Sequence, residues 1–306
     1  MKTLISFVVM GTLVGAAHCW SDKGHMVVAQ IAWKKLSDAE RGRASQMLKK
    51  HPHYDEYLSA ERPGQCPLDL WVFLRASTWP DWVKKNHPDK YSHGEWHDCN
   101  YPFVDPGSNI KLTSDDAPAK KGNLLTQLPV CIDTLTTGSD ADKAVYLCWL
   151  LHLVGDIHQP LHCVSRFSEQ FPKGDDGGQL ALVRVYGKPI VLHDFWDALA
   201  GIENSVDDAI DDIEELVTAE PNLVKEDLSA HKTFESWAKE SFELAKKAGY
   251  LKGDLKVAQL KDDPKVEDIP EVPADYCKNA RRVARLQLAK AGQRLAEQLR
   301  RVLGER

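Results

Sequence analysis

The residues best suited to chemistry lie in one short segment, HLVGDIHQPLH, which spans residues 152–162 and contains three histidines and an aspartate. It follows the apolar run AVYLCWLL, residues 144–151, so it reads as the end of a buried helix. In a helix, His152 and Asp156 are spaced i and i+4, which places their side chains on one face about 6 Å apart. From that spacing both side chains can bind one metal ion or two neighbouring ions.

A second histidine and aspartate pair repeats this spacing. His193 and Asp197 lie at i and i+4 in VLHDFWDAL, at the start of another predicted helix, while Pro160 should end the first helix and return His162 from the turn. One such pair alone is usually a surface ion pair. Several polar groups on an apolar face are costly to bury unless they bind metal or form a hydrogen-bonded or pH-sensing core. Histidine and aspartate without paired thiolates favour a catalytic zinc cluster over a structural zinc site.

The elements that must position these residues are mainly helices. No linker divides the 306 residues, so we expect a mainly α fold, a compact multi-helix single domain with one small β-hairpin. The hairpin is predicted over residues 180–193, with Gly187 and Lys188 as its turn, and residues 261–273 read as a surface loop. Helical spacing of apolar residues predicts helices over 24–36, 38–50, 67–77, 122–136, 141–158, 193–202, 205–218, 230–249 and 275–303.

The N-terminus predicts export. Residues 1–19, MKTLISFVVMGTLVGAAHC, combine a lysine, an apolar stretch too short to span a bilayer, and small residues before a cleavage point. We therefore expect a signal peptide and a secreted or periplasmic protein without a membrane anchor. Removing Lys2 leaves 38 basic and 45 acidic side chains and a formal charge of −7, so no overall basic field indicates nucleic-acid binding.

The number of cysteines also indicates an exported protein. An even number of cysteines would remain after cleavage, which indicates disulfides in an oxidising compartment. Six cysteines allow 15 pairings, and the sequence does not choose among them. Cys99, Cys148 and Cys163 each lie within four residues of a proposed ligand, so their thiolates could compete for zinc. We favour bridges that join the metal-bearing segments over thiolate ligands. The six are Cys66, Cys99, Cys131, Cys148, Cys163 and Cys277.

Further residues extend the pattern to a family resemblance. Trp20 would be the mature N-terminus with His25 five residues on, TWPDW contains Asp81, and EWHDCN contains His97. Together with HLVGDIHQPLH and LHDFWD, these segments resemble the secreted zinc-dependent single-strand nucleases and 3′-nucleotidases, the S-one/P-one nuclease family. That family shares an all-helical fold with the bacterial phospholipase C that hydrolyses phosphatidylcholine. All nine family ligand positions occur here in the family's order, from residue 20 to residue 197.

The resemblance implies three Zn²⁺ ions per chain. With three aspartates among the ligands, the pocket would carry about +3, so the attraction for phosphate lies in the metals rather than in lysines. By the family's arrangement the first ion is held by Asp81, His97, His152 and Asp156. The second is held by the amino nitrogen and carbonyl oxygen of Trp20, by His25 and again by Asp156, and the third by His162, His193 and Asp197.

The implied reaction is hydrolysis of single-stranded DNA, RNA and 3′-nucleotides by a monomeric enzyme, with 5′-phosphate products from the strands. Asp81 would orient the attacking hydroxide, and Lys84 would assist the charge of the transition state, although an exposed helix lysine is the alternative. The sequence departs from the family at DDGGQ, where Gln179 stands at an asparagine position near the scissile phosphate or a bound base. Asp175 of the same motif is either a residue that orients a ligand or a turn former, and His158 is expected to pack rather than bind metal.

Two other functions stay open. A phospholipase C would use nearly the same zinc ions, but its last ligand pair is His-x-x-x-Glu rather than the His-x-x-x-Asp of His193 and Asp197. A non-catalytic zinc-binding protein would favour closed tetrahedral sites over shared carboxylates and an amino-terminal ligand.

Overall fold

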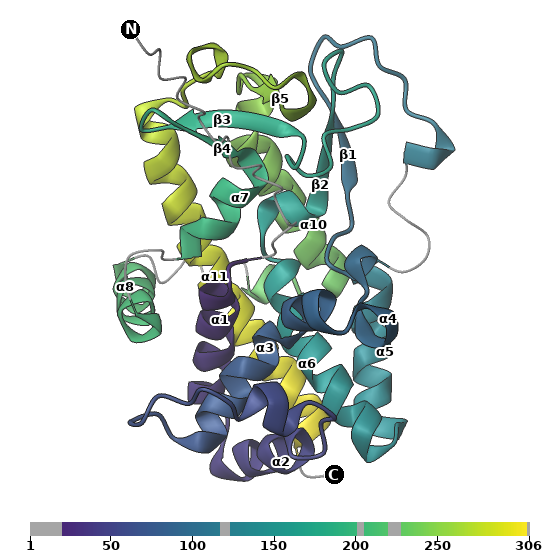
Figure 1. Cartoon of the computed structure of the whole chain (residues 1–306), viewed down its shortest axis with the longest axis vertical. Coiled ribbons are helices and arrows are strands. Elements are labelled where there is room, and N and C mark those ends of the chain that lie inside the picture. Colours follow the sequence, from purple (N-terminus) through teal and green to yellow (C-terminus); the bar gives the residue numbers. More distant parts are fainter. Residues whose placement is uncertain (1–19, 117–122, 201–204, 220–227, 305–306) are drawn as a thin grey trace, which may run out of the picture.

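The structure is a computed structural model that describes residues 20–116, 123–200, 205–219 and 228–304. These residues form a mainly helical single domain, as the sequence predicts (Figure 1). The predicted signal peptide, residues 1–19, lies outside the described residues. None of the described helices is both long and apolar enough to cross a membrane.

Helices make up most of the described chain. The α-helices are α1 (Asp22–Lys35), α2 (Asp38–Leu48), α3 (Leu68–Asn86), α4 (Pro88–Tyr91), α5 (Leu124–Thr137), α6 (Asp140–Asp156), α7 (Leu192–Asp197), α8 (Val206–Ala219), α10 (Phe234–Leu244) and α11 (Ala274–Leu303). Shorter helical turns are η1 (Tyr54–Leu58), η2 (Gly94–Trp96), η3 (Ser114–Asp116), η4 (Pro160–Cys163), η5 (Ala198–Ala200), η6 (Ala245–Gly249), η7 (Leu251–Gly253), η8 (Leu260–Asp262) and η9 (Val266–Asp268).

The strands form two small sheets. They are β1 (Tyr101–Val104), β2 (Val164–Phe167), β3 (Ala181–Val185), β4 (Lys188–Val191) and β5 (Ala258–Gln259). β1 and β2 pair in parallel with Tyr101 opposite Val164, and β3 lies between β4 and β5 in an antiparallel sheet at one end of the molecule (Figure 1).

The core lies among α1, α3, α6 and α11, and α11 runs along most of the molecule's length (Figure 1). α1 and α11 approach very closely at Gly292, where a Cβ atom would lie 2.5 Å from the Cβ of Ile31. Large, fully buried side chains fill the space between the helices and hold the ligand-bearing elements in place. They include Phe73, Trp79, Leu124, Leu128, Trp149 and Trp196.

Two predicted boundaries are wrong. The helix predicted over 67–77 is too short, because α3 continues through Pro80 to Asn86 and so includes Asp81 and Lys84. The hairpin is confirmed, but its turn is Tyr186 and Gly187 rather than Gly187 and Lys188, since Val185 pairs with Lys188. Both turn residues have positive φ, 50° and 77°, which a tight two-residue hairpin requires. The parallel pairing of β1 with β2 was not predicted.

Candidate metal centre

The histidines and aspartates predicted as ligands come from α1, α3, α6 and α7 and from the turns that precede β1 and β2. The structure brings them into three groups, and within each group one ligand atom from every residue lies within 4.8 Å of the others. Side chains far apart in the sequence therefore meet in one place. The groups are His25, His152 and Asp156; Asp81, His97 and His152; and His162, His193 and Asp197.

Asp156 lies at the centre of this arrangement and is completely buried. Its Oδ2 atom is 3.2 Å from Nε2 of His152, one helical turn earlier, and 3.1 Å from Nδ1 of His97. Its Oδ1 atom is 3.4 Å from Nε2 of His25 and 3.6 Å from Nδ1 of His162. One carboxylate thus contacts members of all three groups, which is the position that a shared ligand needs.

His25 can reach this centre because residue 155 is glycine. A Cβ atom on Gly155 would lie 2.7 Å from Nδ1 of His25, well inside van der Waals contact. The ring of His25 stacks on that of His152 at a centroid distance of 3.8 Å. Trp20 is fully buried beside them, and its indole N–H donates to the carbonyl of Gly155 at 3.0 Å. The predicted mature N-terminus therefore lies against the ligand-bearing end of α6.

The third group is built around Asp197. Its Oδ1 atom is 3.6 Å from Nε2 of His162, and its Oδ2 atom is 3.4 Å from Nε2 of His193. Gln159 holds the carboxylate by donating to Oδ1 at 2.7 Å. The amide N–H of Ser21 donates to the backbone carbonyl of Asp197 at 3.2 Å, which fixes the chain next to Trp20 against α7.

Backbone carbonyls set the orientation of three histidine rings. Nδ1–H of His152 donates to the carbonyl of Ser77 at 2.8 Å, that of His162 to the carbonyl of His97 at 2.9 Å, and that of His193 to the carbonyl of Gly177 at 2.8 Å. Each bond leaves Nε2 as the unprotonated nitrogen of the neutral ring, directed at the centre. Histidine ligands of metal ions are commonly held in this way.

The same side chains have buried polar atoms without hydrogen-bond partners. They include both ring nitrogens of His25, Oδ1 of Asp156, Nε2 of His162 and Oδ2 of Asp197. Leaving such atoms unpaired inside a protein costs about 1–3 kcal/mol each, so cations that bind one nitrogen of His25 and the other atoms, group by group, fit the site. Nitrogen and oxygen donors in groups of three, without thiolates, suit zinc with open positions.

The electrostatics of the cluster couple proton and cation binding. Burial lowers the pKa of His152 and His162, but nearby carboxylates outweigh burial and raise the two values to about 9 and about 10. Burial raises the pKa of Asp156, yet the charges of His152 and His162 hold it well below its usual range. Burial lowers the pKa of His25 to about 3. A cation at this centre must displace the protons of His152 and His162, so its binding releases protons.

Of the three residues predicted to act on substrate, Asp81 belongs to one of the ligand groups. The side chain of Asp81 is 16% exposed, and its Oδ1 atom is 4.0 Å from Nε2 of His152. Lys84 follows one turn later on α3 and is partly exposed. Gln179 is partly exposed, and its backbone N–H donates to the carbonyl of Asp176 within the DDGGQ turn.

Two residues next to the ligands have structural partners. Asp175 is fully buried, and its carboxylate accepts from the amide of Arg166 at 2.8 Å and from the hydroxyl of Tyr250 at 2.7 Å. It therefore anchors the turn whose Gly177 carbonyl orients His193. His158 is not a ligand, since Nδ1–H donates to the carbonyl of Val154 at 2.7 Å and Nε2 accepts from Arg294 at 2.7 Å.

Sequence reasoning did not single out Asp98, which lies between His97 and Cys99 in EWHDCN. Burial raises the pKa of Asp98, and the charges of His162 and His193 act against that rise, so its carboxylate lies near the third group. Asn100 donates to it at 2.9 Å. The one feature of the sequence that could have indicated Asp98 is its position directly after His97, a proposed ligand.

A fourth group, His53, Glu56 and His87, also brings ligand atoms within 4.8 Å of one another. Trp79 donates its indole N–H to Nδ1 of His53 at 3.1 Å. This bond places the proton of neutral His53 on Nε2, so neither ring nitrogen has a lone pair free for a metal ion.

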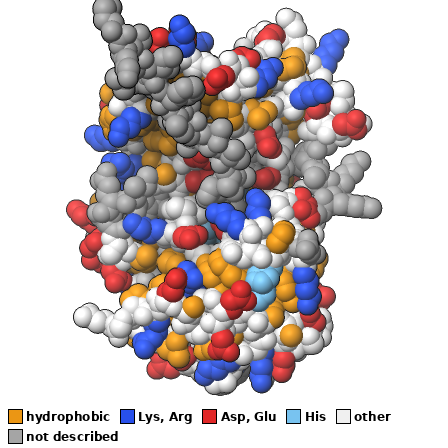
Figure 2. Space-filling view, viewed as in Figure 1, with side chains coloured by type: hydrophobic (Ala, Val, Ile, Leu, Met, Phe, Trp, Pro, Cys, Tyr) orange, Lys and Arg blue, Asp and Glu red, His pale blue; other side chains and the backbone are white. Residues whose placement is uncertain are grey.

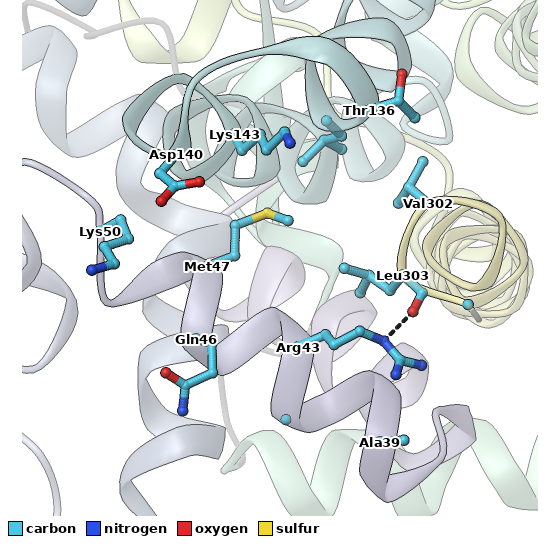
Figure 3. A pocket seen from close by; sticks show the side chains of 13 residues that line it. Ala39, Arg43, Gln46, Met47, Lys50, Thr136, Asp140, Lys143, Val302 and Leu303 are labelled. Atoms are coloured by element: carbon cyan, nitrogen blue, oxygen red, sulfur yellow. Dashed lines mark hydrogen bonds between the residues drawn. The ribbon is translucent and has the colours of Figure 1, made fainter. Parts of the chain in front are cut away.

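A cavity of about 750 Å³ lies elsewhere, between α2, the facing ends of α5 and α6, and the end of α11 (Figure 3). Met47, Leu135 and Val302 line it together with Arg43, Lys50 and Lys143, and none of the candidate ligands does.

Acidic and basic side chains are interspersed over the face shown in Figure 2, in agreement with the absence of an overall basic field.

Comparisons with known proteins identify the family of this chain. Residues 20–304 match the family model described as S1/P1 Nuclease. Endonuclease 4 of Arabidopsis thaliana is 26% identical over 196 residues, which cover 62% of this chain and 58% of that protein. Endonuclease 3 of the same plant is 26% identical over 206 residues, covering 63% and 58%. The chain thus matches less than two thirds of the length of these relatives. Because the family model covers nearly all described residues, the chain belongs to the S1/P1 nuclease family.

Proposed function

We propose that this protein is a zinc-dependent nuclease that hydrolyses single-stranded DNA and RNA to 5′-phosphate products and removes the phosphate of 3′-nucleotides. The observation that carries the proposal is the convergence of the predicted ligands into three groups around buried Asp156. Membership of the S1/P1 nuclease family supports the reaction class. The names of the Arabidopsis relatives, which are called endonucleases, support internal cleavage of strands.

We propose three Zn²⁺ ions, with the nine ligands divided as the family resemblance implies. When bound, these ions supply a water molecule that ionises near neutral pH and positive charge for the phosphate oxygens. Trp20 would contribute its amino nitrogen and carbonyl oxygen once the preceding residues are removed. The close packing of Trp20 against Gly155 supports this assignment.

The protein's own side chains would position the reactants. The other histidine and aspartate ligands have side chains at most 5% exposed, so the 16% exposed carboxylate of Asp81 is the one best placed to accept a hydrogen bond from the attacking water. Lys84, one turn away on α3, would stabilise the negative charge that develops on the phosphate. The amide of Gln179 would contact the phosphate or the adjacent base. A paired duplex holds its bases stacked, so single strands would reach a centre whose ligands are mostly buried more easily.

The remaining features belong to the same proposal. Residues 1–19 would be removed as a signal peptide, and the chain from Trp20 would act as a secreted or periplasmic monomer without a membrane anchor. Cleavage exactly before Trp20 would link export to assembly of the metal centre, because only then does its amino group become free.

The test is an assay of the purified mature chain on single-stranded DNA, the matching duplex, RNA, a 3′-mononucleotide and phosphatidylcholine. We expect hydrolysis of the single strands and the 3′-nucleotide, loss of activity with a chelator, and recovery with zinc. Lys84→Ala should lower turnover by at least tenfold, whereas the exposed neighbour variant Lys85→Ala should not. Activity on phosphatidylcholine alone would favour a phospholipase C, and bound zinc without any hydrolysis would favour a non-catalytic zinc-binding protein.

A further inference from the structure

The tertiary structure brings together two cysteines whose disulfide partners the sequence does not determine. All six cysteines among the described residues are thiols, and five of them are buried. Cys99 lies two residues before β1, and Cys163 lies directly before β2. These strands run side by side in parallel with Tyr101 opposite Val164 (Figure 1). The backbone N–H of Cys99 also donates to the carbonyl of His162 at 2.9 Å, so the two cysteines occupy adjacent positions on neighbouring backbones.

The side chains of these cysteines also meet. The thiol of Cys163 donates to the carbonyl of Ile157 at 3.5 Å. Burial raises the pKa of Cys163, and the thiol of Cys99 is close enough to raise that pKa further. The two residues are 0% and 1% exposed. A disulfide needs Cα atoms about 4.4–6.8 Å apart, which is the separation of residues on hydrogen-bonded neighbouring backbones. By contrast, the groups that act on the thiols of Cys66, Cys131, Cys148 and Cys277 include no second cysteine.

We propose that Cys99 and Cys163 form a disulfide bond that joins the segment carrying His97 to the segment carrying His162. The oxidant is a disulfide of low molecular mass, such as oxidised glutathione. One cysteine thiolate attacks this disulfide and releases one thiol, and the second cysteine then attacks the mixed disulfide and releases the other. Two protons and two electrons pass from the cysteines to the oxidant, which leaves as two thiols. Because both sulfurs are buried, the exchange takes place during folding.

The bond would reinforce contacts that already connect the two ligand-bearing segments. His162 donates Nδ1–H to the carbonyl of His97 at 2.9 Å, and His162 accepts from the amide of Cys99 through its own carbonyl. A covalent link here closes a long loop and reduces the entropy of the unfolded chain. Its buried position protects it from reductants, so it acts as a permanent brace of the site. The proposal does not depend on the nuclease reaction.

The direct test maps the bridge in the mature chain folded with reduced and oxidised glutathione. The protein is denatured without reductant, its thiols are alkylated, and its peptides are analysed by mass spectrometry. We expect a linked pair of peptides containing Cys99 and Cys163 that separates on reduction, and alkyl groups on Cys131 and Cys148. Alkylation of all six cysteines, or a link from Cys99 to any other cysteine, would overturn the proposal.

A second test measures stability with a matched control. Wild type folded with oxidised glutathione should melt roughly 5–10 °C above wild type folded with a phosphine reductant. The difference should vanish in the double variant Cys99→Ala, Cys163→Ala and persist in the control Cys131→Ala, Cys148→Ala, which also loses two buried sulfurs. Persistence of the difference in the first double variant would overturn the assignment. If that variant does not fold, the peptide map of the unaltered chain still decides.

Discussion

Replacement of Gly155 by alanine tests whether the position of His25 is essential to the metal centre. Gly155 lies in the last turn of α6, and the added Cβ would be 2.7 Å from Nδ1 and 3.1 Å from Cε1 of His25. Normal contacts of this kind are about 3.5 Å or longer, so the ring must move by nearly 1 Å. His25 is fully buried and stacked on His152, which leaves it no free space on that side. We therefore expect Gly155→Ala to displace His25.

Gly42→Ala is the matched control, because Gly42 lies inside α2 and a Cβ there meets nothing within 4 Å. Glycine to alanine inside a helix gains about 1 kcal/mol when space is available, so Gly42→Ala should stabilise the protein. At Gly155 an overpacking cost of about 1–3 kcal/mol acts against the same gain. The two variants should therefore differ by about 1–3 kcal/mol, or roughly 2–5 °C in melting temperature for a chain of this length.

The assay combines thermal unfolding, zinc analysis and turnover on a single strand. Gly155→Ala should lose about one zinc per chain and at least tenfold in turnover, whereas Gly42→Ala should keep both. Adding His25→Ala to Gly155→Ala removes the clash, so the double variant should be more stable than the two separate changes predict. If Gly155→Ala is as stable and as rich in zinc as Gly42→Ala, the reasoning about His25 is refuted.

Four further outcomes are expected. Asp156→Asn should lower turnover more than His162→Ala, because Asp156 contacts all three ligand groups; equal losses in a steady-state assay would contradict this division. A mature chain with one extra residue before Trp20 should lose a zinc and most activity, which metal analysis and the same assay can check. Gln179→Asn should raise the specificity constant on homopolymers by about fivefold, worth about 1 kcal/mol, and differently for different bases; a uniform loss would mean that the pocket is adapted to glutamine. Without metal, the raised pKa values of His152 and His162 mean that the native state holds their protons above pH 6.5, so stability should fall as pH rises toward about 9 to 10. With zinc the dependence should reverse, because binding requires those protons to leave, and melting curves with chelator and with zinc across this pH range would show it.

The spacing of residues along the chain determined the local part of the site. The i, i+4 pairs His152 with Asp156 and His193 with Asp197 lie on α6 and α7 with their side chains 3.2 Å and 3.4 Å apart. A helix repeats every 3.6 residues whatever surrounds it, so this spacing is readable from sequence. The same periodicity predicted most helices to within a few residues. The link from these pairs to Trp20 rested on the family resemblance, since no local rule joins residues so far apart.

Only the tertiary structure decided which distant groups meet. The parallel pairing of β1 with β2 depends on which backbones are buried together, and short strands separated by about 60 residues carry no local sign of their partner. That pairing places Cys99 beside Cys163, so the structure supports one particular bridge where the sequence left all 15 pairings of the six cysteines open. The carbonyls that orient the histidine ligands come from elements distant in sequence, and so does Arg294, which donates a hydrogen bond to His158. Their positions follow from how the helices pack, because a backbone carbonyl is chemically identical at every residue and acquires a role only from its neighbours in space.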